Sequence, residues 1–337
     1  MQTIVPLYGF GGGGGTGATL TVTAPSGCTV TVSKDGKTKT KTAGADGVAV
    51  FKGLKSGQWT VTITDGSHTA QKVAVINTDY ALVISFNTLP EFTYTGDYEI
   101  VNDADEPITA SQDNWKIRFL TSGALTFTNL NVAENGIDVF CVGGGGASRW
   151  GGGGGGYTTT QKRIPVSIGT PYDIVIGAGG GSEGANGGET SAFGVSAKGG
   201  YGGKTSSSNR DGGDGGCGGG GWGSPNGGSG GTDGSDGVLV SGTTMRSAGK
   251  GQGTTTREFG ELNAKTYAGG GSGGYGDRIS SGVGGSYVGG SGKGDSSSKN
   301  GQTNTGGGGG GASTITRSSS IYAGGYGGSG VILVRLV

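Results

Sequence analysis

The residues able to carry acid–base or nucleophilic chemistry are few in this sequence and stand far apart. His68 is the only histidine and follows the turn signal Asp65-Gly66, so a Ser-His-Asp triad would have to use a residue in a turn. Paired carboxylates can hydrolyse a glycosidic bond. Asp103, Asp105 and Glu106, however, stand in a polar stretch before a proline, where a solvated loop is expected. We therefore expect no catalytic residues and no enzyme.

Metal ligation has equally little support. Cys28, Cys141 and Cys217 are widely separated, without the CxxC or Cys/His spacing of a zinc site. One disulfide between two of them is an open alternative. Residues 230–240, GGTDGSDGVLV, partly match a calcium-binding repeat. Asp233 stands where that repeat has glycine, and the motif occurs once rather than in an array. We expect no metal and no other cofactor.

The composition lies outside the ordinary globular range. Glycine supplies 85 of the 337 residues and hydrophobic residues only 31%, so part of the chain is either disordered or folds without a large apolar core. Lys+Arg and Asp+Glu both number 24, and a chain without excess positive charge is not expected to bind nucleic acid. No apolar run approaches the roughly 20 residues of a membrane span, so no membrane insertion is expected.

Most of the glycines lie beyond residue 142, which divides the chain into an ordinary part and a glycine-rich part. Residues 1–15 are expected to be an attachment segment followed by a flexible glycine hinge, with a loosely ordered terminus as the alternative. The opening MQTIVPLYGF lacks the basic and apolar segments of a secretory signal. We therefore expect synthesis in the cytoplasm of the producing cell and later release.

Residues 16–88 consist of short runs that alternate apolar and polar side chains, separated by turn signals such as Asp35-Gly36. This spacing predicts a small Ig-like β-sandwich. The stretch DGVAVFKGLKSGQWTVTIT, residues 46–64, resembles the carboxypeptidase-regulatory and PEGA-type Ig-like modules. The resemblance implies a hairpin with Trp59 packed in the core, and a role as a spacer or stalk.

Residues 89–337 are expected to form one glycine-rich domain, framed by β-strands within 92–142, 157–177 and 330–337. The phrases FTYTGDY, NWKIRFLTSGALTF and IDVFCVGGGG occur in that order, and GGYGGSGVILVRLV closes the chain. This ordered set resembles the glycine-rich domains of tail-fibre and tail-tip proteins from phages and prophages of Gram-positive bacteria.

The glycine-rich region has no Gly-X-Y period, which excludes collagen. The strands IDVFCV and VILVRLV bracket it, with IPVSI and YDIVIG near its start, and we expect the bracketing strands to pair. Between them we predict a bundle of polyglycine II helices, which have three residues per turn and bond only to neighbouring helices. T-even-like phage adhesins and snow-flea antifreeze proteins have a similar architecture. Disorder or another loop-rich β fold stays open. The predicted fold class is therefore all-β plus glycine-rich, with essentially no α-helix.

Aromatic and arginine residues that interrupt the glycine runs are the candidate receptor-binding residues, because this composition is typical of adaptable binding loops on a rigid scaffold. Sealing of the lattice is their alternative role. The candidates are Arg149, Trp150, Tyr201, Arg210, Trp222, Arg257, Phe259, Tyr267, Tyr275, Arg278, Tyr287, Arg317 and Tyr322.

The resemblance implies a virion tail protein that attaches to a bacterial surface receptor, either protein or glycan, and contacts other tail proteins through its N-terminus. A homotrimer is an open alternative to a monomer, because no heptad repeat is present. The main alternative function is a purely structural fibre or decoration protein without its own receptor. Ice binding and a depolymerase activity are further alternatives.

Overall fold

The computed structural model describes residues 17–66, 69–84, 91–102, 105–108, 115–129, 136–206, 209–224, 227–238, 244–275, 300–312, 314–315, 320–321 and 323–336. The chain divides into two compact units, Met1–Thr88 and Leu89–Val337, which are described separately. The expected attachment segment, residues 1–15, and His68 lie outside the described residues.

The first unit is a β-sandwich of two sheets. One sheet has the order β4-β1-β7 and consists of β4 (Val48–Leu54), β1 (Ala18–Thr23) and β7 (Tyr80–Val83). The other has the order β3-β2-β5-β6 and consists of β3 (Lys37–Thr42), β2 (Thr29–Lys34), β5 (Gly57–Thr64) and β6 (Thr69–Ile76). Residues of every strand except the exposed edge strand β3 are buried between the sheets, as in Ig-like domains, so the predicted sandwich is confirmed.

The expectation of a hairpin over residues 46–64 is wrong. β4 pairs with β1 and β5 pairs with β2 and β6, so the chain crosses from one sheet to the other between Leu54 and Gly57. Leu54 and Trp59 are both buried, and crossing between the sheets lets each enter the core from its own side. The burial of Trp59 is as expected, and its indole Nε1 donates to the carbonyl of Lys55 at 2.8 Å.

The second unit begins with a two-layer β platform. A five-stranded sheet has the order β13-β12-β21-β10-β9, with β13 (Thr158–Ile164), β12 (Ile137–Val142), β21 (Val331–Leu336), β10 (Lys116–Phe119) and β9 (Tyr98–Val101). A three-stranded sheet has the order β14-β11-β8, with β14 (Pro171–Ile174), β11 (Gly123–Asn129) and β8 (Glu91–Tyr94). The hairpin of β15 (Thr190–Ala192) and β16 (Val195–Ala197) completes the platform.

The platform joins the two ends of the glycine-rich region. β21 runs antiparallel to β12, from Ile137 opposite Leu336 to Val142 opposite Val331, which confirms the predicted pairing of the bracketing strands. The strand expected at 164–168 lies instead at Thr158–Ile164. Pro165 has no N–H to continue the ladder, and Arg163 has a φ of +56°, which explains why the strand ends there.

The glycine runs between these strands form a polyglycine II lattice. The run 143–148 donates its N–H groups in rotation to three antiparallel neighbours, with N···O distances of 2.8–3.0 Å. Gly143 and Gly146 donate to Tyr157 and Gly154, Gly144 and Ala147 to Gly188 and Ala185, and Gly145 and Ser148 to Gly328 and Gly325. A partner that recurs every third residue means three residues per turn, which is the polyglycine II geometry.

The run 151–156 repeats the rotation with other neighbours. Its partners are Gly220 and Cys217 for Gly152 and Gly155, and Gly309 and Gly306 for Gly153 and Gly156. The lattice therefore satisfies backbone groups that no helix or sheet ladder would pair. This confirms the predicted bundle for the described runs.

Side chains are excluded from the lattice because the backbones lie too close together. A Cβ on Gly153 would lie 2.0 Å from the carbonyl oxygen of Gly146, and one on Gly152 would lie 2.1 Å from that of Gly271. Neither glycine has a positive φ, so close approach rather than backbone conformation requires glycine here.

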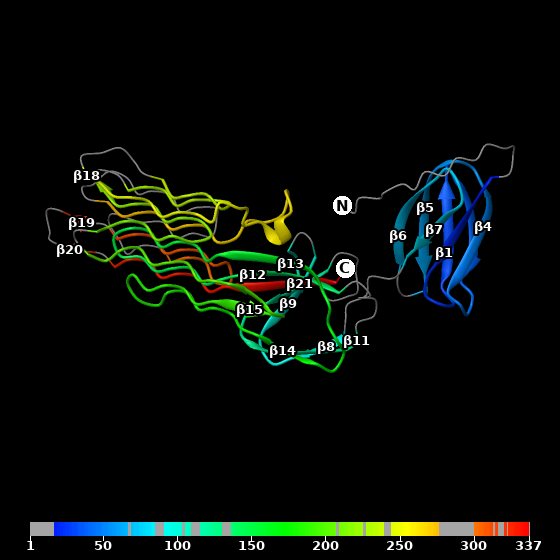
Figure 1. Cartoon of the computed structure of the whole chain (residues 1–337), viewed down its shortest axis with the longest axis horizontal. Coiled ribbons are helices and arrows are strands. Elements are labelled where there is room, and N and C mark those ends of the chain that lie inside the picture. Colours follow the sequence, from blue (N-terminus) through cyan, green and yellow to red (C-terminus); the bar gives the residue numbers. More distant parts are fainter. Residues whose placement is uncertain are drawn as a thin grey trace. The chain divides into compact units, whose positions relative to one another are not determined.

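The runs travel away from the platform and back, which gives the lattice two ends (Figure 1). We call the base the end at β12, β13 and β21, together with residues 252–267. The tip is the opposite end, at residues 149–150, 182–184, 204–206, 209–211, 222–224, 244–246 and 275. At or next to the tip lie the two-residue strands β17 (Gly223–Ser224), β18 (Thr244–Met245), β19 (Thr314–Ile315) and β20 (Ser320–Ile321).

Helical structure among the described residues is limited to one 3-10 turn at the base, η1 (Glu258–Gly260). No described helix has the length and apolar character needed to cross a membrane.

All three cysteines are free and buried. Burial raises the pKa of each thiol, and that of Cys141 reaches about 12. Because the thiolate is the reactive form, we expect iodoacetamide at pH 8 to leave the folded chain unmodified. After unfolding in urea, mass spectrometry should find three adducts. A thiol that reacts rapidly in the folded chain would contradict this packing.

Candidate functional site

Candidate residues at the base pack against the platform. Phe259 and Tyr267 are 2% and 1% exposed, and their rings lie 6.0 and 5.5 Å from that of Phe140 on β12. Arg335 on β21 stacks on Phe259, with its guanidinium carbon 4.3 Å from the ring centroid. These two aromatic residues pack the lattice against the sheet, which is the alternative role stated for the candidates above. They present no surface to a receptor.

Charged side chains under this apolar layer form a buried network. Lys116 on β10 and Glu258 in η1 are 4% and 3% exposed, with Nζ 2.6 Å from Oε1. Asp105 lies 3.3 Å from the ammonium of Lys116 and 2.8 Å from that of Lys265. Burial opposes ionisation of Asp105, but the hydrogen bond from Lys265 and the charge of Lys116 outweigh it, so its pKa is lowered. The expectation that Asp105 is a solvated loop residue is therefore wrong.

The carboxylates of the calcium-like motif have protein partners at the base of the lattice. Asp233 accepts hydrogen bonds from the backbone N–H of Thr256 at 3.1 Å and from Nε of Arg257 at 3.0 Å. Asp236 accepts the backbone N–H of Gly251 at 2.8 Å. Arg257 thus ties two base turns together. No cluster of three metal-ligating side chains occurs among the described residues.

The tip carries the most concentrated set of candidate residues. Arg210 lies between two tryptophans, with its guanidinium carbon 4.7 Å from the ring centroid of Trp150 and 4.3 Å from that of Trp222. Both tryptophans are buried, at 5% and 7% exposure. The indole Nε1 of Trp150 donates to the carbonyl of Thr205 at 3.2 Å. The stack joins three tip turns that are distant in sequence.

Two further arginines border this stack. Arg149 contacts the ring of Trp150 at 5.8 Å and forms an ion pair of 3.0 Å with Glu183. Burial lowers the pKa of Arg210, and the nearby positive charge of Arg246 lowers it further. The backbone fixes these positions, because Trp222 N–H donates to Arg210 and Arg246 N–H donates to Trp222. We call Arg149, Trp150, Arg210, Trp222 and Arg246 the tip cluster.

The tip cluster contains buried donors without partners. The Nε atoms of Arg149, Arg210 and Arg246 and the Nε1 atom of Trp222 have no hydrogen-bond acceptor in the described structure. Arg210 and Arg246 also have no ion-pair partner among the described residues. A site rich in guanidinium N–H donors and short of carboxylates suits an anionic or strongly accepting ligand.

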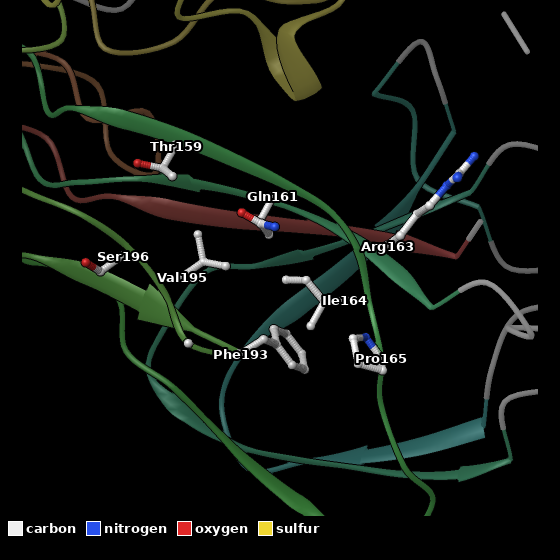
Figure 2. Close-up of a pocket in the computed structure, with 9 residues that line it drawn as sticks. Thr159, Gln161, Arg163, Ile164, Pro165, Phe193, Val195 and Ser196 are labelled. Carbon is white, nitrogen blue, oxygen red and sulfur yellow. The ribbon is translucent and has the colours of Figure 1, made fainter. Parts of the chain in front are cut away.

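A hollow lies on the platform, between the edge strand β13 and the turn of the β15–β16 hairpin (Figure 2). It has a volume of about 440 Å³ and includes Gln161, Arg163, Ile164 and Phe193 in its lining. Phe193 also packs on Tyr172, with ring centroids 4.9 Å apart. Its lining residues include no buried side-chain polar atom without a hydrogen-bond partner, so this hollow offers less to a polar ligand than the tip does.

The remaining candidates differ in position. Tyr201 lies in the run 198–203 on the side of the lattice and is 45% exposed. Tyr275 is at the tip, bridged to Gly223, and is 7% exposed. Arg278, Tyr287, Arg317 and Tyr322 lie outside the described residues. Arg246 and Glu183 were missed by sequence reasoning, although both stand near the end of a glycine run, which is the signal that marked the other candidates.

Fold and site together define an all-β protein in which a two-layer platform anchors a polyglycine II lattice with an arginine–tryptophan tip. A family profile for the glycine-rich domain matches residues 121–337, and the chain belongs to this glycine-rich domain family. No curated protein matches the chain significantly.

Proposed function

We propose that the chain is a phage tail-fibre or tail-tip adhesin that attaches the virion to a receptor on a bacterial surface. The observation that carries this proposal is the tip cluster, held at the end of the lattice that lies away from the platform. Polar donors and aromatic rings on a rigid scaffold are the usual composition of a recognition surface. The finer resemblance of the framing strands to tail proteins agrees with this role.

Within this proposal, the sandwich of the first unit is a spacer, like the carboxypeptidase-regulatory and PEGA-type modules that it resembles. The N-terminus contacts other tail proteins, and the protein acts in the virion tail by binding, without catalysis. The lattice contributes stiffness, because its hydrogen bonds run between helices in every direction around each run.

The test is binding of the fluorescently labelled full chain to a panel of bacterial strains. Saturable binding to a narrow set of strains is expected. A tip variant, Lys204→Cys, and a base variant, Lys162→Cys, are each coupled to a bulky polyethylene glycol maleimide. Both lysines are exposed, and the native thiols are buried. The tip adduct should lose cell binding while the base adduct keeps it.

The alternative is a structural virion component without a receptor. It predicts that the unmodified chain binds no strain although it still assembles into virions. Equal loss of binding from the two adducts would place any receptor contact away from the tip.

A further inference from the structure

Among the residues that the structure describes, no carboxylate forms an ion pair with Arg210 or Arg246 of the tip cluster. The carboxylate of Glu183 is held by Arg149 at 3.0 Å, and the carboxylate of Asp211 accepts the backbone N–H of Ser247 at 2.8 Å. Neither forms an ion pair with Arg210 or Arg246. Two neighbouring guanidinium groups in a partly buried site repel each other, and an anion placed between them would remove this repulsion.

The stacking also fixes which part of Arg210 remains available. Indole rings contact a guanidinium through its flat faces, as the distances of 4.7 and 4.3 Å to Trp150 and Trp222 indicate. The N–H groups of a guanidinium lie in its plane, so stacking on the indole rings uses none of them as hydrogen-bond donors. The Nε atoms of Arg210 and Arg246 are buried and have no acceptor within the described part of the chain. A planar fork of donors is the geometry that binds two oxygens of one oxyanion.

We propose that Arg210 and Arg246 together bind an oxyanion on an anionic cell-surface polymer, with Trp150 and Trp222 holding the guanidinium of Arg210 in position. The inference rests on the adhesin function and names the chemistry of its receptor. A phosphodiester and a carboxylate present the same pair of oxygens, so both are candidate ligand groups.

The full chain is titrated with poly(glycerol phosphate), with polygalacturonate and with uncharged dextran. Intrinsic tryptophan fluorescence is the readout, because two of the four tryptophans belong to the tip cluster. At least one polyanion should give a saturable change that weakens with added salt, and dextran should give none. The polyanion that binds identifies the phosphate or the carboxylate source.

Arg246→Gln should weaken polyanion binding about tenfold or more, since it removes a charge-assisted hydrogen bond to the oxyanion. Arg210→Lys keeps the charge but removes the planar fork, and we expect a similar loss. Lys204→Gln removes one positive charge from an exposed residue of the same tip turn and should bind as the wild type does. Circular dichroism verifies that each variant is folded.

The proposal is overturned if neither polyanion gives a saturable change, or if Arg246→Gln and Lys204→Gln bind equally. Its failure differs from that of the adhesin function. The bulky tip adduct could block cell attachment while Arg246→Gln attaches normally. This result would support attachment through the tip and would contradict anion recognition by these arginines.

Discussion

Gly153→Ala is expected to lower the free energy of unfolding of the glycine-rich unit by about 3 kcal/mol or more, because overpacking against an immobile backbone is costly. The new Cβ would lie 2.0 Å from the carbonyl oxygen of Gly146. Runs on all sides of Gly153 are tied together by hydrogen bonds, so no single run can move away to relieve the clash. Calorimetry of the full chain measures the change in the transition of this unit.

Gly181→Ala is the matched control, since a Cβ on this exposed glycine would meet no atom within 4 Å. Its effect should stay within about 0.5 kcal/mol, and reduced entropy of the unfolded chain can make it slightly stabilising. Equal effects at Gly153 and Gly181 would contradict the close packing of the runs.

Lys116→Met is expected to cost about 3–5 kcal/mol, because it leaves the carboxylate of Glu258 buried without its partner. The two side chains are 4% and 3% exposed and 2.6 Å apart. The double variant Lys116→Met/Glu258→Gln removes both charges and should recover most of the loss. Chemical denaturation at pH 7 measures both. Additive losses in the double variant would show that the pair is not coupled.

The loss in Lys116→Met should also depend on pH. Burial already raises the pKa of Glu258, and removal of the ammonium of Lys116 raises it further. A folded state with a raised pKa binds the proton more tightly than the unfolded state does, so stability increases as the pH falls through that pKa. The deficit of the variant relative to the wild type should therefore shrink between pH 7 and pH 5. A constant deficit would contradict the assignment to Glu258.

The regular parts of the fold could be predicted because local patterns determine them. The turn at Asp35-Gly36 has positive φ at both residues, as a tight hairpin requires. The strands at Ile137–Val142 and Val331–Leu336 are strongly apolar runs at the two ends of the glycine region, and they do pair. The absence of a collagen period together with these bracketing strands was enough to favour polyglycine II.

Sheet membership and burial of polar residues could not be predicted in the same way. Whether residues 46–64 form a hairpin or cross between sheets depends on partners elsewhere in the chain, which local alternation does not specify. Asp105 reads as a loop residue because its cationic partner Lys265 is distant in sequence, and the two meet only after the lattice has folded onto the platform.

The residue types of the candidate site could be predicted from the sequence, but its position in the fold could not. Interruption of glycine runs by arginine and aromatic residues marked both ends of the lattice alike. The three-dimensional course of the runs separates Trp150, Arg210 and Trp222 at the tip from Phe259 and Tyr267 at the base. The runs that lead to the tip and return to the base differ in length, so the sequence alone does not show which interruptions lie at which end.

The central claim is that the glycine runs are a rigid, hydrogen-bonded scaffold that holds the tip. Amide hydrogen exchange of the full chain tests it most directly. Gly145 and Gly155 donate to Gly328 and Cys217 at 2.8 and 2.9 Å, so peptides covering these runs should exchange slowly, whereas the exposed tip turn at 182–183 should exchange fast. Rapid exchange throughout the runs would mean that they are a flexible tether, and would contradict this account.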